Sequence, residues 1–100
     1  MIDIEYKNNG RPSNDFTDGR IVDEIINSEK KQGYYVTSSF TFIMLIRFAV
    51  CQKRINCDDI MFIFNDKKIR IDQNGCFLDE LPKEYKIQEN ILHYVFNLIN

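Results

Sequence analysis

The longest apolar run of the chain covers residues 40–51 and is interrupted by only two polar side chains. A run of this length predicts a helix that is apolar nearly all round and is covered on more than one side. The preceding residues 34–37 are aromatic and β-branched, which predicts a short buried strand. Gly33 favours the end of an earlier helix, and Ser38 or Ser39 is suited to cap the following one.

The spacing of apolar positions predicts further elements on either side of this central segment. Residues 1–6 predict an edge strand, and Asp18 is expected to cap a helix over 19–31. Residues 60–64 predict a buried strand that forms a hairpin with a half-exposed strand over 69–72, and a last helix is expected from about residue 87. The expected order is β-loop-α-β-α-β-β-α.

This order predicts an α/β fold, with α+β as the alternative, built as a two-layer or three-layer sandwich with a β-hairpin. Residues 7–15 read KNNGRPSND, a composition typical of loops. We therefore expect a flexible N-terminal arm over 1–17 and a single domain over 18–100. A chain of 100 residues is long enough for one domain with its own core.

Composition and charge narrow the function classes. The net charge of −2 provides no basic field for a polyanion, so nucleic-acid binding is not expected. The apolar run of residues 40–51 is shorter than the roughly 18 to 20 residues that span a bilayer, and no signal peptide is recognised. A cytoplasmic protein is expected. Cys51, Cys57 and Cys76 lack the close paired spacing of a zinc site and are expected to be reduced thiols.

Two groups of side chains are candidates for function. Thr37, Ser38 and Ser39 could bind phosphate at a helix N-terminus, although capping of the helix explains them better. A set of aromatic and apolar side chains near the C-terminus either completes the core under the hairpin or forms an exposed patch for a partner. The candidates for that partner-binding patch are Phe77, Leu81, Tyr85 and Tyr94. The only histidine, His93, lies off the apolar stripe and has no triad or ligand partner at a suitable spacing.

A family resemblance rests on several motifs in order. These are the apolar helix residues 21–26, the segment YYVTSSFTF at 34–42, the pair Ile46-Arg47, INCDDIMFI at 55–63, and IRIDQNGCFLDELPKEY at 69–85. In this order and spacing, residues 19–94 resemble the C-terminal portion of the nucleotide-binding domain of OLD-like ABC-type AAA ATPases, a class found in anti-phage defence and mobile-element systems. The resemblance implies that residues 37–39 correspond to the switch loop of that family.

The departures from the family pattern matter for activity. The switch histidine of the family is Ser38 here, and its tryptophan is Leu81. The four glycines stand apart, so the sequence contains no phosphate-binding loop of the form G-x-x-x-x-G-K-[ST]. We therefore expect no enzyme activity, no cofactor and no catalytic or metal-binding residue.

The expected function is a non-catalytic binding module or small subunit in a bacterial or phage defence or counter-defence system. Its partner would be a larger protein, with an ATPase or nuclease complex as the candidate, or a second copy in a homo-oligomer. Two alternatives stay open: a free-standing phage-encoded inhibitor, such as an anti-defence or immunity protein, and one half of a split nucleotide site in which Ser38 approaches a nucleotide held by another subunit.

Overall fold

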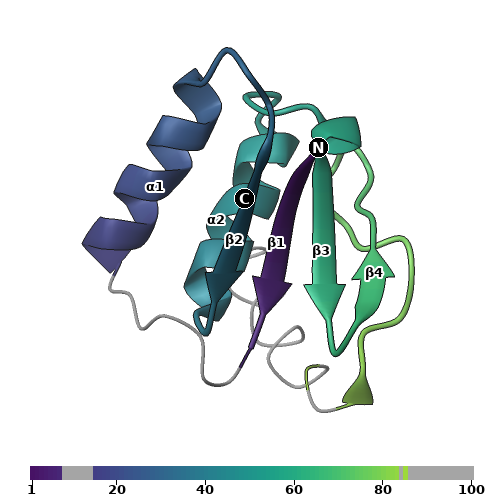
Figure 1. Cartoon of the computed structure of the whole chain (residues 1–100). Coiled ribbons are helices and arrows are strands. Elements are labelled where there is room, and N and C mark those ends of the chain that lie inside the picture. Colours follow the sequence, from purple (N-terminus) through teal and green to yellow (C-terminus); the bar gives the residue numbers. More distant parts are fainter. Residues whose placement is uncertain (8–14, 84, 86–100) are drawn as a thin grey trace, which may run out of the picture.

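A four-stranded mixed sheet in the order β2-β1-β3-β4 organises the chain (Figure 1). The computed structural model describes residues 1–7, 15–83 and 85. The elements in chain order are β1 (Ile2–Tyr6), α1 (Asp15–Asn27), β2 (Gly33–Thr37), α2 (Phe40–Cys51), the short 3₁₀ helix η1 (Cys57–Asp59), β3 (Ile60–Phe64) and β4 (Lys67–Ile69). The predicted α/β fold in a single small domain is confirmed. The expected last helix lies outside the described residues.

Strand β1 lies at the centre of the sheet, so its prediction as an edge strand was wrong. It pairs in parallel with β2 on one side and with β3 on the other. Asp3 and Glu5 point to the sheet face away from α2, while Ile2 and Ile4 enter the core. The expected arm over 1–17 thus begins with a core strand and ends within α1, and its residues 8–14 lie outside the described residues.

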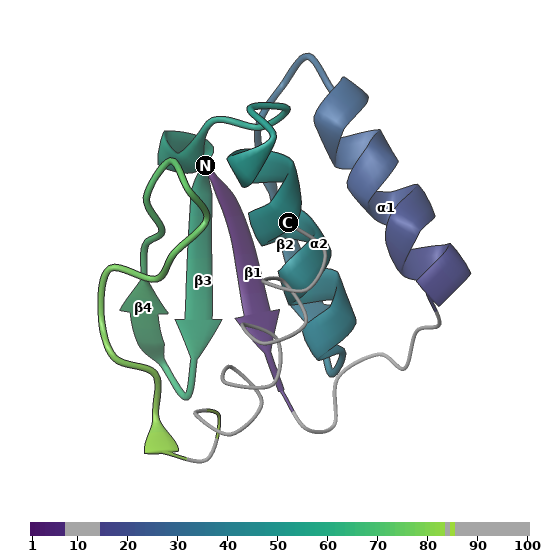
Figure 2. The ribbon, with the colours of Figure 1, turned by 180° about the vertical axis from the view of Figure 1, so that it is seen from behind.

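Strand pairing assigns the side chains to two faces, because residues paired across strands point the same way. The face under α2 carries Ile2, Ile4, Tyr6, Tyr35, Thr37, Ile60, Phe62, Phe64 and Ile69. Aromatic contacts join this face to α2: the ring centroids of Tyr6 and Phe40 are 4.5 Å apart, and those of Tyr35 and Phe42 are 6.3 Å apart. In the described part of the chain, the sheet and α2 form two layers (Figure 2).

Helix α2 has the predicted bounds, and its core-facing residues include Phe42, Ile43 and Ile46. Helix α1 packs against α2 and lies beyond the β2 edge of the sheet in both views (Figures 1 and 2). It begins and ends four residues earlier than expected. Beyond its end, the ammonium group of Lys31 donates to the carbonyls of Ile25 and Ile26, both at 2.8 Å, and so caps the helix.

The predicted hairpin is present as β3 and β4. Its turn residues Asn65 and Asp66 both have positive φ, 49° and 66°, as a two-residue type I′ turn requires. The second strand was expected over 69–72, but β4 begins at Lys67 and ends at Ile69, so the two ranges share only Ile69. Strand β2, expected to be buried, is an edge strand, and its Tyr34 is 57% exposed.

A buried arginine of α2 binds the loop that follows the hairpin. Arg47 is only 7% exposed, and its Nε donates to the carbonyl of Gly75 at 2.7 Å. Its guanidinium carbon lies 4.3 Å from the centroid of the Phe77 ring, which is within cation–π distance. Gly75 has a φ of 80°, and a Cβ at this position would lie 2.5 Å from the Arg47 carbonyl oxygen. The loop can therefore approach α2 this closely only with glycine at position 75.

Candidate functional site

The loop between β2 and α2 contains Thr37, Ser38 and Ser39, which the resemblance predicted to be a switch loop. Ser39 caps α2, since its hydroxyl accepts from the Phe42 backbone N–H at 3.3 Å. The Ser39 backbone N–H in turn donates to Thr37 Oγ1 at 2.9 Å, and Ser38 is half-buried between them. The predicted capping role of Ser39 is confirmed. The Thr37 and Ser39 hydroxyls thus both take part in ordering the loop.

Asp18 is the charged partner of this loop. The Ser39 hydroxyl donates to Asp18 Oδ2 at 2.9 Å, and Asp18 is 1% exposed. The second carboxylate oxygen, Oδ1, is buried without a hydrogen-bond partner. The prediction of Asp18 as an N-cap was wrong, because α1 begins at Asp15. A signal for the true position was present: Asp18 precedes Val22 and Ile25 by four and seven residues, so it lies on the buried stripe of the helix.

A cavity of about 320 Å³ lies between α1 and the edge strand β2, next to Asp18. Most of its walls are apolar or aromatic. The lining residues are Thr17, Asp18, Ile21, Tyr34, Tyr35, Val36, Thr37 and Phe42. Sequence reasoning did not find this cavity, because it is formed by two elements that are separated along the chain.

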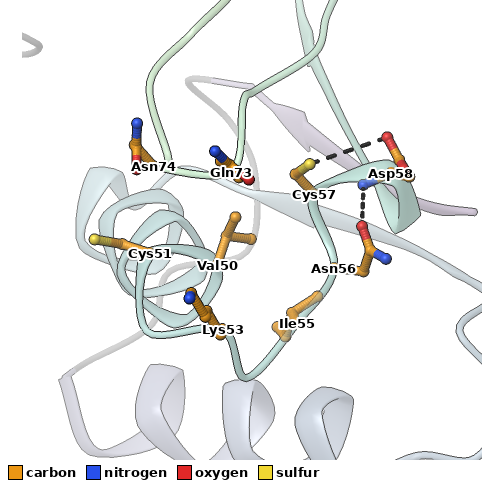
Figure 3. Close-up of a pocket in the computed structure, with 9 residues that line it drawn as sticks. All are labelled: Val50, Cys51, Lys53, Ile55, Asn56, Cys57, Asp58, Gln73 and Asn74. Carbon is orange, nitrogen blue, oxygen red and sulfur yellow. Dashed lines mark hydrogen bonds between the residues drawn. The ribbon is translucent and has the colours of Figure 1, made fainter.

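A second cavity, of about 560 Å³, lies at the other end of α2 (Figure 3). It is lined by Val50, Cys51, Lys53, Ile55, Asn56, Cys57, Asp58, Gln73 and Asn74. Two of the three cysteines border it, but Figure 3 shows that the Cys51 sulfur points away from Cys57. Cys57 Sγ instead contacts Asp58 Oδ1 at 4.0 Å, and Asn56 caps η1 by accepting from the Asp58 N–H. The two thiols therefore do not form a shared ligand site.

The residues expected to bind a partner lie mostly inside the molecule. Leu81 and Tyr85 are buried, and Phe77 is half-buried against Phe62 and Phe64. Tyr94 lies outside the described residues. The sequence left a core role and an interface role open for these aromatic groups, and the structure places Phe77 and Tyr85 against the core.

The sheet face opposite α2 carries a mixed surface that sequence reasoning did not single out. We call it the open face, and it consists of Asp3, Glu5, Tyr34, Val36, Met61, Ile63 and Lys68. Figure 1 looks onto this face, and no described helix crosses it. At its centre the Tyr34 hydroxyl donates to the Glu5 carboxylate, and Lys7 Nζ lies 3.7 Å from Glu5 Oε1. The hydrogen bond to Glu5 raises the pKa of Tyr34.

Two classes of site find no support among the described residues. The described residues include no group of three His, Cys, Asp or Glu side chains that could hold a metal ion. None of their helices has the length and apolar composition that a membrane span needs.

Comparison with known proteins gives no relative: no protein-family model, no curated protein and no solved structure matches this chain.

Proposed function

We propose that this protein is a non-catalytic binding module that docks onto a larger protein through the open face. The observation that carries the proposal is a side of the parallel sheet that no described helix covers. Strands β2, β1 and β3 are all parallel, and sheets of this kind are almost always covered on both faces. Here α2 covers one face, while Val36, Met61 and Ile63 are half-buried on the other.

The charge of the open face indicates the chemistry of the partner. Asp3 and Glu5 lie on the central strand, with Val36 on one neighbouring strand and Met61 and Ile63 on the other. Lys7 already compensates Glu5, so Asp3 is the acid that docking would bury. Because a buried acid requires a compensating partner, the complementary surface would place an arginine or lysine over Asp3 and apolar side chains around it. Arginine is also among the residues that most often anchor protein interfaces.

The resemblance to the terminal portion of an OLD-like ATPase supports a partner in a defence or counter-defence system. A lobe separated from a larger domain would expose the surface that its parent covered. An ATPase or nuclease complex is therefore our candidate partner, and a cytoplasmic location fits this role.

The contacts of Asp18 argue against a split nucleotide site. Ser39, the cap of α2, already donates to a carboxylate, which brings a negative charge to the end of the helix where a phosphate would bind. Two anions at one helix end repel each other. We propose that Ser38 does not contact a nucleotide held by another subunit. A calorimetric titration with Mg-ATP tests the proposal that the protein is non-catalytic. Stoichiometric binding heat or ATP hydrolysis would refute it.

The docking surface is tested with two charge-introducing variants. Ile63→Glu places a carboxylate on the open face, while Leu78→Glu introduces the same group at an exposed apolar residue elsewhere. Both variants and the unchanged protein are tagged in the native host, and the stoichiometry of the recovered complex is measured. We expect a complex that Ile63→Glu abolishes and Leu78→Glu retains, with both variants folded by circular dichroism. A complex retained by Ile63→Glu, or an unchanged protein that is recovered alone, would contradict the proposal.

A further inference from the structure

The buried carboxylate of Asp18 is not fully paired within the described structure. Its Oδ2 accepts one hydrogen bond from Ser39, whereas Oδ1 has no partner although it is shielded from solvent. A buried carboxylate oxygen without a donor is costly, and native proteins usually satisfy such atoms with protein, water or a ligand. This atom therefore calls for a donor that the described side chains do not supply.

The cavity beside Asp18 has the size and walls of a small-molecule site. Its volume of about 320 Å³ falls at the lower end of the range for ligand pockets. Ile21, Val36 and Phe42 are apolar lining residues, and Tyr34 and Tyr35 also border the cavity. No lysine or arginine is among the described lining residues, so the Asp18 carboxylate has no cationic counterpart there.

We propose that this cavity binds a small organic cation, consisting of a primary ammonium group on a compact aromatic or aliphatic body. Oδ1 is shielded from solvent, so the ammonium group would reach it through a rotation of the Asp18 side chain, and would then supply the missing donor as a charge-assisted hydrogen bond. The apolar body would pack against Val36 and Phe42, and the ring of Tyr35 would favour a cation by its negative face. A metal ion fits less well, because a single carboxylate is the only charged ligand among the described lining residues. The site goes beyond the proposed docking function and does not depend on it.

The experiment compares two probes of the same shape. Benzylamine carries a primary ammonium group, and benzyl alcohol replaces it with a neutral hydroxyl. Each is titrated into the ¹⁵N-labelled full chain, and amide shifts are followed by NMR. We expect saturable shifts at Tyr35, Val36 and Thr37 with benzylamine, at an affinity at least about tenfold higher than that of benzyl alcohol.

Two variants test whether the Asp18 carboxylate is the charge that binds the ammonium group. Asp18→Asn keeps the size of the side chain and removes its charge, so it should lower benzylamine affinity by about tenfold or more. Glu24→Gln makes the same change at an exposed acid of α1 and should leave the affinity unchanged. If Asp18→Asn fails to fold, Ile21→Trp, which fills the cavity from its wall, should abolish the shifts instead.

Three results would overturn the proposal. The first is the absence of saturable shifts up to about 10 mM benzylamine, a concentration that would reveal even millimolar binding. The second is equal affinity for both probes, which would mean that the site selects apolar shape alone. The third is a folded Asp18→Asn or Ile21→Trp protein that binds benzylamine as the unchanged protein does.

Discussion

The hydroxyl of Ser39 donates to the Asp18 carboxylate across 2.9 Å, and this bond joins the first turn of α2 to the buried stripe of α1. The same hydroxyl accepts from the Phe42 N–H, so one side chain both caps α2 and connects the two helices. The carboxylate lies at the end of α2 where the helix dipole favours negative charge. Ser39, which was predicted to belong to a switch loop, thus stabilises the packing of the two helices.

Replacing Ser39 by alanine should lower the free energy of unfolding by about 1 to 2 kcal/mol, because it removes the cap and leaves the buried Asp18 carboxylate without this donor. Urea unfolding measures the change. In a double-mutant cycle with Asp18→Ala, the double variant should lose less stability than the sum of the two single losses, by about 0.5 kcal/mol or more. Ser28→Ala, at an exposed serine, is the control and should stay within about 0.5 kcal/mol of the unchanged protein. Additive losses would show that the bond contributes nothing in solution.

Two glycines should respond in opposite directions to alanine. Gly75→Ala should destabilise the protein by about 2 kcal/mol or more, because it combines a φ of 80° with a Cβ placed 2.5 Å from the Arg47 carbonyl oxygen. Gly19→Ala should stabilise it by about 0.5 to 1 kcal/mol, since this glycine lies within α1 and a Cβ there meets no atom within 4 Å. Melting temperatures of both variants measure the difference. Equal shifts would contradict the described path of the loop around Gly75.

The sequence predicted those parts of the fold whose signal is local. The apolar run predicted the bounds of α2, Ser38 or Ser39 was expected to cap it, and Asn65, Asp66 and Lys67 were typical of a turn between the hairpin strands. The position of β1 could not be obtained in this way. Its alternation of Ile2 and Ile4 with acids fits any strand that has one polar face, and only the pairing with β2 and β3 shows that the strand is central.

The candidate sites were harder to predict than the fold, because each combines distant segments. The cavity beside Asp18 needs α1 to lie along β2, and the open face needs three strands in register. Asp18 itself was missed for a different reason. An acid before a helical stripe is typical of an N-cap, and that interpretation hid its place on the stripe.

Tyr34→Phe should change how stability depends on pH. The pKa of Tyr34 is raised above 10 in the folded protein, mainly by its hydrogen bond to Glu5, so the folded state holds the phenolic proton more tightly than the unfolded state. Its contribution to stability is complete below pH 10 and is lost as the pH rises through the folded pKa. The stability difference between the unchanged protein and Tyr34→Phe should therefore be constant from pH 7 to 9 and shrink above 10. Urea unfolding across this range measures it, and a difference that grows with pH would contradict the bond.

The last prediction separates core from interface at Tyr85. This side chain is 5% exposed, and its ring centroid lies 5.0 Å from that of Tyr6 and 5.3 Å from that of Phe64. Tyr85→Ala should therefore lower the free energy of unfolding by about 3 to 5 kcal/mol, as expected for a buried aromatic residue. Tyr85→Phe removes only the hydroxyl that donates to Asn65 Oδ1 at 3.2 Å, and should cost about 1 kcal/mol.

Thermal melting of these two variants beside Ile63→Glu gives the comparison that bears on function. A core role for Tyr85 requires that Tyr85→Ala melts far below the unchanged protein, whereas a docking role for the open face requires that Ile63→Glu loses the partner and stays folded. If Tyr85→Ala instead kept its melting temperature and lost the partner, the contact surface would include the aromatic cluster near the C-terminus. The open face would then no longer be needed to explain binding, because loss of the partner would follow from a residue on the other side of the sheet.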